Sequence, residues 1–306
     1  MSNFSVTILG NSSAVPAYGR NLTSQLIKIH NHYILIDCGE GTQQLLLAAR
    51  VNLNKIRHIL ISHLHGDHYF GLVGLLSTMH LFQRPLPLHL YGPPELLNIL
   101  SIQFAASETT LAFDLHFHPL DATKTQQILS HKKFTIDAFP LKHRLPCCGF
   151  RIMETPKPRR IRKEKLHDGI SLADIGSFLK GMDVIDDKGD ILYKVEDYTL
   201  EPKKSLSYAF CSDTIYDPDI VPYVLGVDLL YHEATFTEEM KERASHTMHS
   251  TAKQAASIAK AASVGKLILG HFSIRYEDLT PLLNEAKEVF LSTELSECGK
   301  TWYLEA

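Results

Sequence analysis

The sequence has little tryptophan, little cysteine and no long apolar run. One Trp and five Cys occur in 306 residues, and no two of the Cys have the CxxC spacing. An odd number of thiols in a chain of this length disfavours a disulfide scaffold and favours a reducing, cytoplasmic location. No stretch of eighteen apolar residues is present, so we expect no membrane span. The N-terminal residues lack a basic head and a cleavage site, so we expect no secretory signal.

The chain also lacks a strong net charge. It has 31 Lys and Arg against 34 Asp and Glu, a formal net charge of −3, which excludes a global electrostatic attraction to nucleic acid. The positive charge is locally concentrated, however, because residues 157–165 (KPRRIRKEK) hold six cationic side chains and one Glu. This run is either a solvated surface or a site that binds phosphate groups. The candidate phosphate contacts are Arg159, Arg160, Arg162 and Lys163.

Predicted strands and helices alternate in both halves of the chain. Strands are predicted at 4–9, 24–29, 33–37, 57–62, 88–91, 115–118, 134–141, 206–213, 227–232, 266–271 and 301–304. Helices are predicted over 42–50, with Thr42 as N-cap, over 71–82 and 251–262, and from 95 and 278. Apolar periodicity fades at 154–204, where prolines and charges cluster. The pattern predicts one α/β domain over 1–306 with an insertion at 154–204.

Histidine is abundant, with 17 residues, and its densest cluster follows a predicted strand. His63-Leu64-His65-Gly66-Asp67-His68 places four potential metal ligands within six residues. In a loop leaving a strand, His63 and His65 can converge on one cation, while Asp67 and His68 turn toward a second. Imidazole and carboxylate groups suit zinc without any cysteine ligand. A buried core histidine explains a lone His, but it does not explain this cluster.

This HxHxDH motif resembles that of the metallo-β-lactamase superfamily, and further motifs follow in that family's order. Four of them stand at the ends of predicted strands, where α/β sheets place their sites: Asp37, His143, Asp213 and His271. The resemblance implies an αββα sandwich, two mixed sheets flanked by helices. It also implies two zinc ions per subunit, one held by His63, His65 and His143, the other by Asp67, His68 and His271, with Asp213 bridging. Asp37 would orient a ligand histidine, and Mn²⁺ or Fe²⁺ could replace zinc.

More specific motifs resemble those of the ribonuclease Z family. They are residues 9–16 (LGNSSAVP) with Arg20-Asn21, residues 232–235 (HEAT), residues 249–251 (HST) and residues 271–276 (HFSIRY). The resemblance implies a zinc-dependent endoribonuclease that removes the 3′ trailer of precursor tRNA, leaving a 3′-hydroxyl on the tRNA and a 5′-phosphate on the trailer. It also implies a homodimer, in which the flexible arm formed by 154–204 in one subunit binds the tRNA that the other subunit cuts. A departure is that this arm lacks a compact Gly- and Pro-rich tip.

Three residues are the candidates for catalysis. We expect Asp67 to orient the attacking water as well as to bind metal. His249 is the candidate proton donor to the leaving 3′-oxygen, with Glu233 holding its ring and raising its proton affinity. The alternative for His249 is a helix-start histidine without a chemical role.

Contacts to the substrate near the cut are predicted less specifically. Ser12, Ser13 and Arg275 are candidates, although each is equally well explained as a turn residue or a surface cation. Tyr69 and Phe70 are interpreted as packing residues. The alternative function for the whole chain is a small-molecule phosphodiesterase or arylsulfatase of the same fold.

Overall fold

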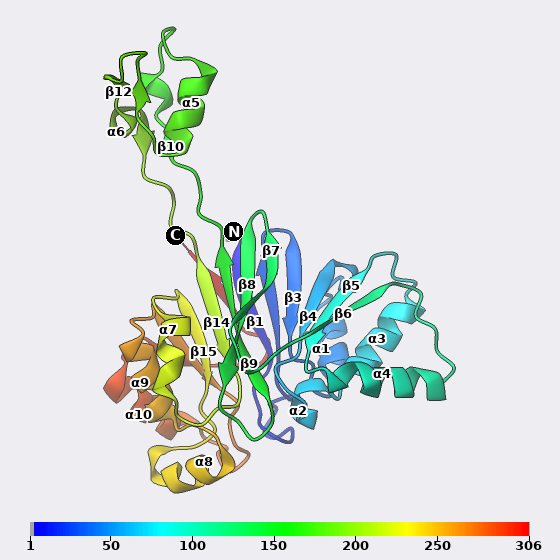
Figure 1. The fold of residues 1–306 in the computed structure, drawn as a ribbon. Coiled ribbons are helices and arrows are strands. Elements are labelled where there is room, and N and C mark those ends of the chain that lie inside the picture. The colour runs from blue at the N-terminus through cyan, green and yellow to red at the C-terminus, as the bar shows by residue number, and fades with distance from the viewer. Residues whose placement is uncertain (1–2, 306) are drawn as a thin grey trace.

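Two seven-stranded sheets face each other in the computed structural model, which describes residues 3–305 (Figure 1). The first sheet has the order β18 (Thr301–Leu304), β1 (Phe4–Gly10), β2 (Ser24–Ile29), β3 (His32–Ile36), β4 (Ile56–Leu60), β5 (Leu88–Gly92) and β6 (Leu115–Pro119). The second has the order β17 (Thr293–Leu295), β16 (Lys266–Gly270), β15 (Leu229–Glu233), β14 (Ser207–Cys211), β9 (Cys147–Glu154), β8 (Phe134–Leu141) and β7 (Gln126–His131). Strands β3–β6 are parallel to one another, and so are β14–β17.

Helices cover the outer faces of both sheets (Figure 1). The first sheet is followed along the chain by α1 (Thr42–Ala48), α2 (Gly66–Tyr69), α3 (Leu72–Leu81) and α4 (Glu95–Ala106). The second sheet carries α7 (Val221–Val224), α8 (Lys241–Thr247), α9 (Ala252–Ala261) and α10 (Thr280–Val289). The predicted αββα sandwich, two mixed sheets flanked by helices, is therefore confirmed. Among residues 3–305, no helix combines the length and the hydrophobicity that a membrane span needs.

Three apolar clusters hold these layers together. The central cluster lies between the sheets and joins residues such as Ile34 and Leu60 of the first sheet to Phe150 and Tyr208 of the second. The other two clusters pack the helices against each outer face. Strands that are buried on both faces, such as β16 with its sequence KLILG, have nearly continuous hydrophobic runs because neither face meets water.

Helix starts follow local capping chemistry. Thr251 caps α9 with a complete capping box, in which its hydroxyl accepts from the Gln254 amide and the Gln254 side chain accepts from the Thr251 amide. The prediction that Thr42 caps the first helix is wrong. Gly41 occupies that position with a φ of 85°, and the Thr42 hydroxyl donates instead to the Gly39 carbonyl.

The segment between β9 and β14, residues 155–206, projects away from the sandwich (Figure 1), and we call it the arm. It contains β10 (Arg160–Ile161), α5 (Leu172–Leu179), β11 (Val184–Ile185), β12 (Ile191–Tyr193), α6 (Val195–Tyr198) and β13 (Thr199–Leu200). β10 pairs with β13, and β11 pairs with β12. Phe178 and Tyr198 stack at 4.9 Å between ring centroids, so the arm has a small core of its own.

Candidate metal centre and active site

Four side chains from three separate parts of the chain converge at one end of the sandwich. The Nε2 atom of His63 lies 3.0 Å from His65 Nδ1, which lies 3.2 Å from His143 Nε2. Asp213 Oδ2 is 3.6 Å from His63 Nε2 and 3.7 Å from His143 Nε2. His63 and His65 follow β4, His143 follows β8 and Asp213 follows β14.

A second group uses the other oxygen of the same aspartate. Asp213 Oδ1 lies 3.3 Å from His68 Nε2 and 3.2 Å from His271 Nε2. Asp67 Oδ2 lies 3.5 Å and 3.4 Å from these two nitrogens. Asp213 thus stands between a group with three histidines and a group with two histidines and an aspartate.

The spacing of these atoms fits metal ligation. Four ligands placed about 2.0–2.1 Å from a zinc ion in a tetrahedron are roughly 3.3 Å apart, and the distances within both groups run from 3.0 to 3.7 Å. His68 Nε2 and Asp213 Oδ1 are buried without a hydrogen-bond partner, which is costly unless a cation satisfies them. The residues present therefore fit a pair of metal ions.

The ring nitrogens that face away from each group are held by the protein. His68 Nδ1 is 2.7 Å from Asp37 Oδ2, and His143 Nδ1 donates to the Met248 carbonyl at 2.8 Å. Partners on the remote nitrogens fix the tautomer and direct the other nitrogen at the metal. His63 Nδ1 and His271 Nδ1 are held in the same way by hydroxyl groups, at 3.0 Å from Ser62 Oγ and Thr235 Oγ1 respectively.

Burial and mutual charge keep several groups in their ligating forms. Burial lowers the pKa of His63 well below its ordinary value, with His68 adding to the effect, and burial also lowers the pKa of His143. Burial acts to raise the pKa of Asp213, but the charges of His271, His68 and His63 hold it well below its ordinary value. The structure thus favours neutral imidazole at His63 and His143 and ionised carboxylate at Asp213, which are the forms that bind metal.

Close backbone approach and left-handed backbone conformations shape this end of the sandwich. A Cβ at Gly39 would lie 2.5 Å from the Asp67 carbonyl oxygen, so only glycine lets these two loops meet. Asp37, Met248 and His271 have φ of 56°, 59° and 58°, values that non-glycine residues rarely adopt. Such conformations cluster where a protein positions functional groups.

His249 lies beside the metal ligands on the loop before α9. Its ring stacks on His271 at 5.3 Å between centroids, and its Nδ1 is 2.9 Å from Glu233 Oε1. Burial acts to lower the pKa of His249, but the charge and hydrogen bond of Glu233 outweigh it and raise the pKa to about 9. The ring is therefore poised to carry a proton at neutral pH.

A cleft of about 510 Å³ opens over these groups. His65, Asp67, Asp213, His249 and His271 lie in its wall, together with residues 13–16. Phe70 also lines it with 63 % of its surface exposed, and its ring packs over Gly66. An exposed aromatic ring beside a hydrolytic centre is suited to stacking on a base.

Comparisons with known proteins agree with this arrangement. A family model described as the anti-Pycsar protein Apyc1 matches residues 4–157, the half that carries the His63–His68 loop and His143. Ribonuclease Z of Cytophaga hutchinsonii is 48% identical over 302 residues, which are 99% of this chain and 96% of that protein. Ribonuclease Z of Bacteroides fragilis is 40% identical over 97% of this chain and 98% of that protein. The chain belongs to the ribonuclease Z family. It is thus an endoribonuclease of the class that hydrolyses phosphodiester bonds in tRNA processing.

Solved structures extend the likeness to three dimensions. The short form of human tRNase Z superposes with a TM-score of 0.72 at 25% identity, covering 99% of this chain and 100% of that one. The metallo-β-lactamase fold protein YhfI of Bacillus subtilis gives a TM-score of 0.69 at 21% identity, covering 98% of each chain, and shows the same fold.

The residues predicted to contact substrate near the cut lie in different environments in this ribonuclease Z family member. Ser13 lines the cleft. Ser12 is 0% exposed and its hydroxyl donates to the Val15 carbonyl at 2.8 Å, which fits the alternative interpretation as a turn residue. Arg275 is exposed but is not among the residues that line the cleft.

The predicted cations of the arm also divide into two kinds. Arg159 Nε donates to Thr199 Oγ1 at 2.7 Å and its Nη2 pairs with Glu201 Oε1, while Arg162 Nε donates to the Thr199 carbonyl at 3.1 Å. These two therefore support the fold of the arm. Arg160 donates to the Glu201 carbonyl but is exposed, and Lys163 is exposed without an ion-pair partner in the described chain.

Two functional residues were absent from the sequence prediction. Ser62 donates to Asp37 Oδ2 at 2.8 Å while contacting His63. Thr235 donates to Glu233 Oε2 at 2.7 Å while contacting His271, so it joins the metal ligands to the Glu233–His249 pair. The only available signal was their position, because Ser62 precedes His63 and Thr235 ends the HEAT motif.

Proposed function

We propose that this chain is a zinc-dependent 3′-processing endoribonuclease, which cuts precursor tRNA to leave a 3′-hydroxyl on the tRNA and a 5′-phosphate on the trailer. The observation that carries the proposal is the pair of ligand groups that share Asp213, with tetrahedral spacing on both sides. His63, His65 and His143 would hold one ion, and Asp67, His68 and His271 the other. When bound, two zinc ions would neutralise charge on the scissile phosphate and activate the attacking water.

The chain's own residues supply the proton steps. The Asp67 carboxylate would accept a hydrogen bond from the attacking water and orient it toward phosphorus. The His249 imidazolium would donate its Nε2 proton to the ribose 3′-oxygen as the bond to phosphorus breaks, which leaves a 3′-hydroxyl. Glu233 supports this role, because its charge keeps His249 protonated and its hydrogen bond at Nδ1 leaves Nε2 free to face substrate.

The arm would bind the folded part of the tRNA. Its exposed Arg160, Lys163 and Lys165 offer phosphate contacts, and a protein recognises an RNA double helix mainly by its shape and phosphates. The basic run at residues 157–165, with six cations and one Glu, would give local RNA affinity without a positive net charge of the chain.

Strand direction supports a homodimer in which the arm serves the partner's active site. His143 follows the end of β8, and the antiparallel β9 then runs through eight residues before the arm begins. At 3.3 Å per residue the arm base is roughly 25 Å from the metal centre, and the arm points away from it (Figure 1). We also propose a cytoplasmic location, in which the five free cysteines stay reduced.

Deletion of the arm tests the division between binding and chemistry. Residues 158–203 are removed and Lys157 is joined to Lys204 by a short Gly-Ser linker, which keeps the Lys157–Glu154 and Lys204–Asp228 ion pairs. We expect the variant to retain two zinc ions by elemental analysis and to hydrolyse bis(p-nitrophenyl) phosphate, but to lose cleavage of precursor tRNA. Undiminished cleavage of precursor tRNA would contradict the role of the arm. If the intact chain hydrolyses the small ester but never precursor tRNA, it is a small-molecule phosphodiesterase.

A further inference from the structure

The hydroxyl group of Thr235 lies between a candidate metal ligand and a buried carboxylate. Thr235 follows β15 and is 3% exposed. Its Oγ1 is 2.7 Å from Glu233 Oε2 and 3.0 Å from His271 Nδ1. Two backbone hydrogen bonds hold the residue in place, because its amide donates to Glu233 Oε2 at 3.0 Å and its carbonyl accepts from the Ser273 amide at 3.2 Å. The hydroxyl therefore has a fixed position between the two groups.

The single proton of this hydroxyl has one suitable acceptor. Burial acts to raise the pKa of Glu233, but the charge and the hydrogen bond of His249 hold it below its ordinary value, so both carboxylate oxygens accept. The Thr235 proton therefore goes to Glu233 Oε2, at the shorter of the two distances. His249 Nδ1 is 3.4 Å from the same hydroxyl and has a nearer acceptor in Glu233 Oε1, at 2.9 Å. Toward His271 the Thr235 oxygen can only accept, so His271 Nδ1 must carry a proton.

A proton on Nδ1 determines what the other nitrogen of His271 can do. Nε2 then has a free lone pair, and it lies 3.2 Å from Asp213 Oδ1 and 3.4 Å from Asp67 Oδ2, the carboxylates that would share an ion with it. A neutral imidazole without a partner distributes its proton between its two nitrogens, and the form protonated on Nε2 cannot bind metal there. The Thr235 hydroxyl thus selects the form of His271 that binds metal.

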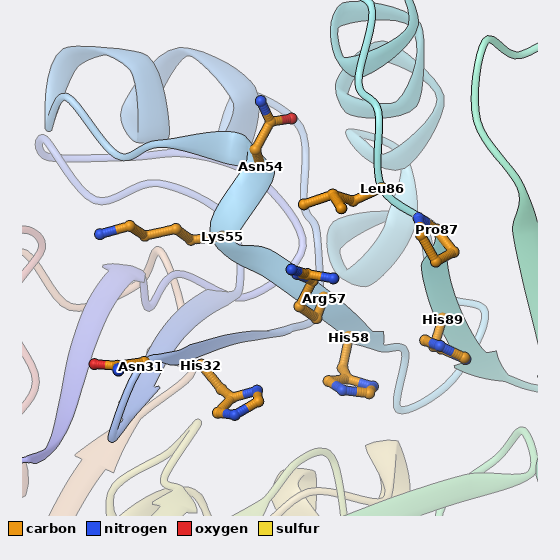
Figure 2. Close-up of a pocket in the computed structure, with 9 residues that line it drawn as sticks. All are labelled: Asn31, His32, Asn54, Lys55, Arg57, His58, Leu86, Pro87 and His89. Carbon is orange, nitrogen blue, oxygen red and sulfur yellow. The ribbon is translucent and has the colours of Figure 1, made fainter.

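Burial alone does not give a histidine such a partner. His58 and His89 project from neighbouring strands near the start of β4 and β5 (Figure 2). His58 is 9% exposed, but its Nδ1 makes no hydrogen bond within residues 3–305. His89 Nδ1 lies 3.0 Å from His118 Nε2, a ring nitrogen rather than a group linked to a carboxylate. The link from His271 to Glu233 is therefore a feature of the candidate metal centre.

We propose that Thr235 is a positioning residue, which fixes the Nδ1-protonated form of His271 and connects this zinc ligand to Glu233. The inference rests on the proposed zinc centre. One carboxylate then serves two histidines, because Glu233 holds His249 directly through Oε1 and holds His271 through the Thr235 hydroxyl on Oε2. Only the second link passes through the hydroxyl. Loss of the hydroxyl should therefore weaken the zinc site and spare the proton donor.

The test compares Thr235→Val, which removes the hydroxyl, with Thr235→Ser, which keeps it. In competition titrations with a chelator, Thr235→Val should bind one zinc ion about tenfold more weakly, the lower end of the usual effect of losing a partner of a ligand. Thr235→Ser should bind zinc as the wild type does. The matched control is Thr293→Val, at a buried threonine on β17 whose hydroxyl donates to the Phe290 carbonyl, and it should also bind zinc as the wild type does.

Two results of this titration would overturn the proposal. One is a zinc affinity of Thr235→Val equal to that of the wild type. The other is an equal weakening in Thr235→Ser, which would mean that the methyl group of Thr235 matters and its hydroxyl does not. A wild-type protein that binds no zinc would refute the proposed zinc centre itself, and this proposal with it, so the two failures are distinguishable.

Histidine ¹⁵N NMR of the zinc-loaded protein reads the form of His271 directly. In the wild type, Nδ1 should be protonated and Nε2 bound to zinc, and the Nδ1 proton should exchange with water faster in Thr235→Val. His58 is the internal reference and should not change. An exchange rate at His271 that is the same in both proteins would contradict the role of Thr235.

A comparison of two substrates at saturating zinc separates the two links of Glu233. Thr235→Val should keep the wild-type ratio of precursor tRNA cleavage to bis(p-nitrophenyl) phosphate hydrolysis, because His249 keeps its bond to Glu233. Glu233→Gln should lower this ratio, because it weakens the proton donor. An equal fall of the ratio in both variants would show that the hydroxyl does not act on the zinc ligand separately.

Discussion

The Glu233 carboxylate holds the His249 ring, and both of its oxygens also accept hydrogen bonds from other groups. Its Oε1 is 2.9 Å from His249 Nδ1 and also accepts from the backbone amides of Thr214 and Ser250 at 3.1 and 3.0 Å. Its Oε2 accepts from the amide and the hydroxyl of Thr235 at 3.0 and 2.7 Å. Four donors besides the histidine keep this buried carboxylate ionised and immobile, so it both charges and orients the His249 ring.

A proton donor matters only when the leaving group needs a proton. We therefore expect His249→Ala to slow cleavage of precursor tRNA by about 10²–10⁴-fold, the usual contribution of general acid catalysis. Hydrolysis of bis(p-nitrophenyl) phosphate should fall far less, because p-nitrophenolate leaves without protonation. Single-turnover rates on both substrates, at equal zinc content, make the comparison. Equal losses on the two substrates would rule out the donor role.

The pH profile of RNA cleavage should depend on Glu233. His249 donates only in its protonated form, so activity is present below its pKa, about 9, and is lost as pH rises through it. Glu233→Gln removes the main charge that raises this pKa, and the alkaline limb of kcat/KM should move to lower pH. His246→Gln, on the neighbouring α8, is the matched control and should leave the limb in place. A limb that does not move in Glu233→Gln would mean that another group controls it.

Asp37 should control metal affinity without touching metal. It accepts from the Ser62 amide at 2.7 Å and holds His68 Nδ1 at 2.7 Å. Loss of such a partner typically lowers metal affinity about 10–100-fold. In a competition titration, the Asp37→Asn variant should therefore lose its zinc at a chelator concentration lower by about that factor. Asp121→Asn, at a more exposed carboxylate remote from the ligands, is the control. Unchanged zinc affinity in Asp37→Asn would contradict this role.

The dimer proposal predicts that two inactive variants restore each other. A subunit lacking residues 158–203 keeps its metal centre, and a His249→Ala subunit keeps its arm. If the arm of one subunit serves the active site of the other, a mixed dimer contains one complete active site. Each mixed dimer should then have up to about half the activity of a wild-type dimer. Cleavage of precursor tRNA after co-refolding measures this. No recovery, with mixed dimers demonstrated by mass, would place the arm on its own subunit's site.

Local motifs in the sequence pointed to the residues that the structure gathers at the candidate metal centre, because histidine and aspartate are dense there. His63–His68 lie within one loop, and His143, Asp213 and His271 each end or follow a strand, so their side chains gather at one end of the sandwich. The αββα layers followed from alternating strands and helices together with the family resemblance.

Other features depend on tertiary contacts that the sequence does not display. Strand β9 (CCGFRIME) alternates poorly and was not predicted, although it pairs with both β8 and β14 in the centre of the second sheet. Ser12 resembles a loop hydroxyl in the sequence, and only packing shows that it is buried. Ser62 and Thr235 acquire their roles from partners 25 and 36 residues away.

The most direct measurement is the mapping of products from a precursor tRNA with a 3′ trailer. We predict a single cut at the 3′ end of the tRNA body, a 3′-hydroxyl on the tRNA and a 5′-phosphate on the trailer, with activity abolished by a chelator and restored by zinc. A 2′,3′-cyclic phosphate on the tRNA, stepwise loss of single nucleotides, or full activity after demonstrated metal removal would contradict the account.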